Sequence, residues 1–257
     1  MVAWAQLIAV AILVGQGAPT QGDAQARRIR ELIQTMGGAS YREGDMLRIT
    51  PADTACDSLV RIGKPAIPYL LEALKSPEGW SKVHAMEVLA KLHAAVAVRP
   101  MVRILRTDRE LGVRAVAANS LGPLGDRSVI PDLLKAAASP NMELALGAWR
   151  SLGQLRAAAA VPILVKHLDM TVVARIEHGN AMEDPTVVVA LIRIGKPAVP
   201  ALKTAFRTLG GESRTGAALA LGGIGSKDAV AALKEGLKHR RTRDAAERGL
   251  AYGKAYR

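Results

Sequence analysis

Residues 61–70 read RIGKPAIPYL, and residues 193–202 read RIGKPAVPAL. Two nearly identical decapeptides this far apart indicate internal repetition, which is the sequence signature of a repeat architecture. The second proline of each motif belongs to a column that recurs in steps of 32, 31, 31, 38 and 31 residues, with alanine in the last unit. This column consists of Pro68, Pro100, Pro131, Pro162, Pro200 and Ala231.

Two columns of apolar residues follow the same rhythm. The first lies before the proline and is leucine in every unit: Leu59, Leu89, Leu121, Leu152, Leu191 and Leu221. The second lies two residues after the proline: Leu70, Val102, Leu133, Leu164, Leu202 and Leu233. Because one helical hairpin cannot bury its own apolar stripe, units of this kind are expected to stack into a continuous core.

Glycine and proline predict where the helices of each unit end and begin. Gly63, Gly125, Gly195 and Gly225 tolerate the left-handed conformation that closes a helix. The column proline then fits the first turn of the second helix, where its missing N–H costs nothing. Ser139, which stands before a proline, is expected to cap the first helix of its unit.

Two longer stretches carry a family resemblance. Residues 117–134 read AANSLGPLGDRSVIPDLL, and residues 218–233 read ALALGGIGSKDAVAAL. Together with the two IGKPA motifs, these stretches resemble the PBS lyase HEAT-like (E-Z type) repeats of the HEAT-repeat superfamily, over about residues 51–238. The resemblance implies an all-α fold, a right-handed α-solenoid (α-α superhelix) of about six helical-hairpin repeats. It does not single out a function, because one repeat fold serves lyases, DNA-repair relatives and scaffolds.

The ends of the chain are expected to differ from its middle. Residues 4–15 read WAQLIAVAILVG, an uncharged apolar run that is shorter than the roughly 20 residues of a membrane span and suits a signal peptide. We therefore expect a signal peptide over residues 1–22, a capping helix and loop over residues 23–50, and the repeat domain over residues 51–257. The expected location is periplasmic, envelope-associated or secreted. The alternative for the apolar run is a buried N-terminal helix.

The charge balance favours acidic partners. The chain has 35 Lys and Arg against 23 Asp and Glu, which gives a formal net charge of +12. A surplus of this kind attracts an acidic protein, an anionic polymer or nucleic acid. Aromatic residues make up only 3% of the chain, which argues against binding of single strands by base stacking.

Basic residues recur on the predicted second helices, three, four or seven positions after the proline column. Such positions share one face of a helix. In HEAT-like stacks the second helices line the concave surface, so the resemblance implies a basic groove for a partner. The alternative is an ordinary solvated face, with cations favoured near helix C-termini by the helix dipole. The candidate groove residues are Arg103, Lys135, Lys166, Lys203, Arg207, Lys234 and Lys238.

The sequence offers no convincing catalytic or metal-binding motif. It lacks a phosphate-binding loop and an HExxH pair. Residues 211–215 (GESRT) depart from the G-x-S-x-G nucleophile pattern at the last position. His178 has carboxylates near it in the inserted loop Met170 to Asp184, but a solvated loop is the preferred interpretation, since tight metal sites need fixed ligand geometry. Cys56 is expected to be buried and inert.

These observations predict a non-catalytic protein-interaction scaffold that grips an acidic partner in a basic groove and has no cofactor. One alternative is a nucleic-acid-binding HEAT-like protein, which the expected export disfavours. Another is an enzyme or chaperone resembling the bilin lyases, for which the chain shows no feature beyond the repeat itself.

Overall fold

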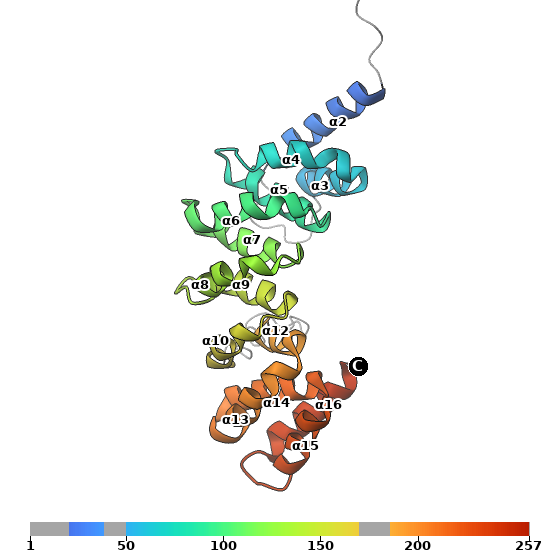
Figure 1. The fold of residues 1–257 in the computed structure, drawn as a ribbon. Helices are drawn as coiled ribbons and strands as arrows, with labels where there is room; N and C mark the ends of the chain where they lie inside the picture. The colour runs from blue at the N-terminus through green and yellow to red at the C-terminus, as the bar shows by residue number, and fades with distance from the viewer. Residues whose placement is uncertain (1–20, 39–49, 170–185, 257) are drawn as a thin grey trace, which may run out of the picture. The chain divides into compact units, whose positions relative to one another are not determined.

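The computed structural model describes residues 21–38, 50–169 and 186–256. Over these ranges the chain forms α-helices and short 3-10 turns and contains no β-strand (Figure 1). The predicted all-α solenoid fold is confirmed. No helix in these ranges is both long and apolar enough to cross a membrane. The expected signal peptide, residues 1–22, lies almost entirely outside the described residues.

The chain divides into two compact units, residues 1–88 and 89–257, with the boundary inside α5 (Gly79–Lys91). In the first unit, α2 (Gln21–Met36) packs against α3 (Pro51–Ile62) and α4 (Ile67–Ala73). Helix α2 overlaps residues 23–50, over which a capping helix and loop are expected. Its buried residues are Ile29, Leu32 and Met36.

Two polar contacts fix the helix ends of the first unit. Thr50 and Asp53 form a reciprocal capping box at the start of α3, with N···O distances of 3.2 Å and 2.9 Å. His84 of α5 lies with Nδ1 2.7 Å from the carbonyl oxygen of Met36. This contact ties α5 to the C-terminal end of α2.

The second unit alternates first and second helices of successive repeats. Consecutive first helices pack against one another, and so do α14 and α16. The first helices are α7 (Leu111–Leu121), α9 (Met142–Gln154), α12 (Thr186–Ile194) and α14 (Gly211–Ile224). The second helices are α6 (Val98–Thr107), α8 (Ile130–Ala137), α10 (Val161–Lys166), α13 (Val199–Thr208) and α15 (Lys227–Gly236), and the single helix α16 (Arg243–Ala255) follows them.

The leucine column forms the centre of the core. All six of its leucines are fully buried, with no exposed surface. The second apolar column is also buried except in α6, where Met101 takes the core position that Val102 was predicted to hold. The reason is a shift of register: Pro100 is the third residue of its helix, whereas Pro131 and Pro200 are the second residues of theirs.

The two rows of helices in the second unit pack differently. The first helices approach so closely that a Cβ atom on Gly147 would lie 2.5 Å from the carbonyl oxygen of Ala115. Gly153 is equally close to the backbone of Ala190, at 2.6 Å. Between the second helices, in contrast, open grooves lie between α6 and α8 and between α13 and α15. The side chains that face these grooves are therefore accessible to a partner.

Candidate protein-interaction surface

The structure places the seven predicted basic residues on the second helices, or directly after α15 for Lys238. Lys203 is half-buried and the other six are exposed. We call the side of α6, α8, α10, α13 and α15 that carries these residues the basic face: Arg103, Lys135, Lys166, Lys203, Arg207, Lys234 and Lys238.

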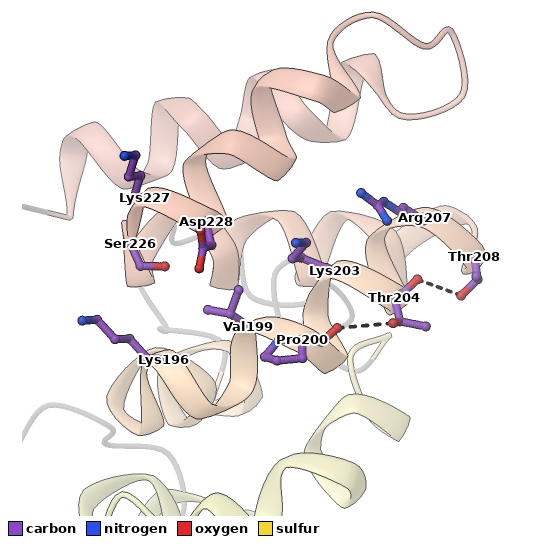
Figure 2. A pocket seen from close by; sticks show the side chains of 10 residues that line it. All are labelled: Lys196, Val199, Pro200, Lys203, Thr204, Arg207, Thr208, Ser226, Lys227 and Asp228. Carbon is purple, nitrogen blue, oxygen red and sulfur yellow. Dashed lines mark hydrogen bonds between the residues drawn. The ribbon is translucent and has the colours of Figure 1, made fainter.

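The groove between α13 and α15 has a volume of about 710 Å³ (Figure 2). It includes two predicted cations, Lys203 and Arg207, and two further ones, Lys196 and Lys227. Asp228 is the one acidic residue that lines it. Within the described residues none of these four cations makes an ion pair. The groove therefore carries an excess of positive charge that the described chain leaves unneutralised.

The hydroxyl groups of this groove are occupied by local hydrogen bonds. Thr204 donates to the carbonyl oxygen of Pro200 at 3.3 Å, and Thr208 donates to that of Thr204 at 2.9 Å (Figure 2). Ser226 caps α15 by accepting a hydrogen bond from the backbone N–H of Ala229 at 3.3 Å. The threonine protons are thus used within α13, whereas the lysine and arginine side chains and the Ser226 hydroxyl proton remain as donors for a ligand.

The groove between α6 and α8 has a volume of about 560 Å³ and contains Arg99, Arg103 and Arg106. Here the charge is compensated from within, because Arg106 donates two hydrogen bonds to Asp132, each 2.7 Å long. Hydrogen bonding from Arg106 is the main cause that holds the pKa of the Asp132 carboxyl below its ordinary value. Asp126 supplies a second carboxylate, whose pKa is lowered by hydrogen bonds from Ser128.

The structure brings together only part of the predicted set. Lys203 and Arg207 share one groove, and Arg103 lies in the other. Lys135, Lys166 and Lys234 are exposed on the basic face but line neither groove.

Lys238 makes an ion pair with Glu235 at 2.8 Å, which lowers the pKa of the Glu235 carboxyl and offsets the charge of Lys238. Sequence reasoning missed the groove cations Lys196 and Lys227, because it counted positions only forward from the proline column. Both lie four residues before that column, and for Lys196 the lysine of the repeated IGKPA motif was the available signal.

Two arginines of the first helices have structural roles. Arg114 Nε donates to the carbonyl oxygen of Leu105 at 2.9 Å, and Arg214 Nε donates to that of Phe206 at 3.2 Å. Each bond satisfies a free carbonyl near the C-terminal end of the preceding second helix. Arg114 and Arg214 therefore stabilise the contact between successive repeats.

The residues considered as a nucleophile or as metal ligands form no such site within the described residues. Cys56 is buried in α3. Within the described ranges no three His, Cys, Asp or Glu side chains gather as metal ligands would. His178 and its inserted loop, Met170 to Asp184, lie outside those ranges.

Two models of known repeat families match parts of the repeat region. A family model described as HEAT repeats matches residues 98–183, and one described as PBS lyase HEAT-like repeat matches residues 213–239. None of the curated protein sequences matches the chain significantly.

Several solved structures align with this chain at low sequence identity and with TM-scores below 0.5. Human deoxyhypusine hydroxylase in complex with glycerol is 19% identical, over 93% of this chain and 100% of that one, with a TM-score of 0.43. The complex of CpcE and CpcF of phycocyanin lyase from Nostoc sp. PCC7120 is 19% identical, over 86% of this chain and 99% of that one, with a TM-score of 0.47. An engineered protein is 17% identical, over 92% of this chain and 93% of that one, with a TM-score of 0.35. Within its stacked hairpins this chain therefore contains HEAT repeats over residues 98–183 and a repeat of the PBS lyase HEAT-like type over residues 213–239.

Proposed function

We propose that this protein is a non-catalytic scaffold that binds an acidic partner protein along the basic face. The observation that carries the proposal is the groove between α13 and α15, where four cations surround a single carboxylate. A row of cations beside low-dielectric walls focuses the electrostatic potential and speeds the approach of an anionic partner.

The non-catalytic part of the proposal rests on the character of the same groove. Its threonine hydroxyls are bonded to backbone carbonyls, and no histidine or cysteine lines it. General acid–base or nucleophilic catalysis usually relies on such groups within reach of a substrate. Cations on a rigid helical frame are suited to binding.

The location of this function follows from the apolar run at residues 4–15. We propose that the protein is exported and meets its partner in the cell envelope or outside the cell. N-terminal sequencing of the protein isolated from its native source should find a chain that begins between Gln16 and Arg27. An intact Met1 on the native protein would contradict export.

The experiment for the binding function compares charge reversals on the two rows of helices. The protein is immobilised, partners are captured from the native envelope fraction and identified by mass spectrometry, and each capture is repeated at low and high salt. The variant Lys135→Glu, Lys166→Glu, Lys203→Glu should lose the captured partner at low salt. The difference in captured partner between the wild type and this variant should shrink at high salt, because screening then weakens the attraction of the partner to the wild type as well.

The control reverses two arginines, Arg150 and Arg193, which are exposed on the first helices α9 and α12. Neither side chain makes a hydrogen bond or ion pair within the described residues, so its reversal should leave the fold intact. Arg114 and Arg214 are unsuitable here because of their structural hydrogen bonds. Equal losses in both variants would mean that net charge acts diffusely and that the basic face is no binding site.

A further inference from the structure

The two grooves of the basic face are equivalent parts of different repeats. Helix α6 aligns with α13 at an offset of 101 residues, since they begin at Val98 and Val199. Helix α8 aligns with α15 at an offset of 100, with Leu133 and Leu233 at the same fully buried position. The structural hydrogen bonds of the first helices agree with this alignment, because Arg114 and Arg214 are 100 residues apart and their acceptors, Leu105 and Phe206, are 101 residues apart.

This equivalence pairs Arg106 in one groove with Arg207 in the other. Arg106 holds the carboxylate of Asp132 through two hydrogen bonds across the repeat boundary. The position of Asp132 is taken by Ala232 on α15. Both sites are largely shielded from solvent, with 11% of the Asp132 side chain and 7% of Ala232 exposed. Arg207 therefore occupies the position equivalent to Arg106, but α15 has no carboxylate at the position equivalent to Asp132.

The surroundings of Arg207 strengthen its preference for an anion. Lys203 and Arg207 extend from α13 on the side that faces α15, and Lys196 and Lys227 flank them (Figure 2). An arginine guanidinium matches a carboxylate in a bidentate geometry, which makes such pairs strong and directional. In the equivalent groove that geometry is already filled by the chain's own Asp132.

We infer that the groove between α13 and α15 is the anchor site of the basic face, in which an Asp or Glu carboxylate of a partner protein binds Arg207 as Asp132 binds Arg106. This inference rests on the proposed function and adds to it the location and the chemistry of the main contact. The groove between α6 and α8 is blocked by the internal pair and contributes only weak, general attraction.

The dimensions and lining favour a short acidic peptide segment. Helix α13 has 10 residues and is therefore about 15 Å long. An extended chain of roughly four to five residues spans that length. No aromatic side chain lines the groove, so it offers no platform on which nucleic-acid bases could stack. Val199 and Pro200 supply apolar contact for the stems of acidic side chains.

The test measures the affinity of the full chain for a fluorescein-labelled hexaglutamate peptide by fluorescence anisotropy. Ala232→Asp places on α15 a carboxylate equivalent to Asp132 on α8. The new carboxylate should bind Arg207 and compete with the peptide, which should weaken hexaglutamate binding about tenfold. Arg207→Gln should weaken binding to a similar extent without adding a charge to α15, which covers the case in which Ala232→Asp fails to fold. Ala251→Asp, an exposed position on α16, is the matched control for net charge and should bind like the wild type.

A reciprocal variant tests the blocked groove. Asp132→Ala releases Arg106, so the number of hexaglutamate peptides bound per chain should rise from one to two. Wild-type affinity in both Ala232→Asp and Arg207→Gln would overturn the anchor site. With that result, the proposed function would still hold if the triple reversal of Lys135, Lys166 and Lys203 weakened hexaglutamate binding.

The proposed function itself fails if hexaglutamate shows no salt-dependent binding to the wild type. Tighter binding of an oligothymidylate of equal charge would also overturn the anchor site, since it would identify the ligand as nucleic acid.

Discussion

Two residues of the second unit, His93 and Arg156, have positive φ angles of 49° and 50°. They stand at the helix-closing position where other repeats have Gly63, Gly125 or Gly195, which also have positive φ angles. A side chain in the left-handed region costs about 1–2 kcal/mol, because its Cβ crowds the following carbonyl oxygen. The sequence predicted helix ends at the glycines. It could not reveal the strain at the other two sites, since neither residue type signals that conformation.

Replacement of Arg156 by glycine should therefore stabilise the protein. The Arg156 side chain is exposed and makes no hydrogen bond within the described residues, so its removal costs little. We expect Arg156→Gly to raise the free energy of unfolding by about 0.5–1 kcal/mol, as relief of strain outweighs the added freedom of the unfolded chain. Urea denaturation measures the change. Gly125→Ala should shift the free energy in the opposite direction, because a Cβ there meets no neighbour and only the φ of 75° opposes it. A destabilised Arg156→Gly would contradict the argument.

At the scale of the helical element, the column proline decides how each second helix begins. Pro200 has no N–H to donate to the carbonyl of Lys196, and residues 196–198 form a separate 3-10 turn before α13. Ala231 does have an N–H, and α15 starts directly at Lys227. The sequence predicted a proline in the first turn but not this added turn.

One predicted helix start was also wrong. Ser139 accepts a hydrogen bond from the N–H of Asn141, and the Asn141 side chain caps α9 by accepting from Leu144 at 2.9 Å. Both residue types are good caps, so the sequence pattern alone could not decide between them.

The ion pair between Arg106 and Asp132 joins α6 to α8 and should make this junction sensitive to pH. The pKa of Asp132 is lowered in the folded protein, so the carboxylate stabilises the fold above its unfolded value of about 3.9. That contribution is lost as the pH falls through the lowered folded pKa. Asp132→Asn should therefore be less stable than the wild type in urea at neutral pH. The difference should shrink below about pH 4 and vanish below the folded pKa of Asp132. A difference that persists unchanged in strong acid would show that Asp132 acts through shape and not through charge.

At the scale of the whole molecule, the sequence predicted the repeat, its core columns and the row that carries the basic residues. It did not predict which charges the fold neutralises, because Arg106 and Asp132 are far apart in sequence and meet only when two repeats stack. The positive charge of the basic face is consequently uneven. In the groove between α6 and α8 two carboxylates offset part of the charge of three arginines, whereas the groove between α13 and α15 has four cations and one carboxylate.

The stacking of repeats also predicts which helices of the second unit should lose stability when one contact is disrupted by a substitution. Helix α16 packs on α14 through glycine, since a Cβ on Gly222 would collide with the backbone carbonyl of Gly249. Gly222→Ala must push the two helices apart, at a cost of about 1–3 kcal/mol typical of an overfilled core. Each repeat contacts mainly its neighbours, so a local defect should loosen only its surroundings.

Hydrogen exchange measured by mass spectrometry should show protection lost in α14, α15 and α16 but kept in α7 and α9. Gly112→Ala adds a methyl group in open space on α7 and should leave the exchange pattern as it is in the wild type. Loss of protection throughout the second unit in Gly222→Ala would mean that the repeats unfold together as one cooperative block. In that case the shape of the groove between α13 and α15 would depend on every repeat of the second unit. Local unfolding would instead mean that its shape depends on α13, α15 and the neighbouring contact between α14 and α16.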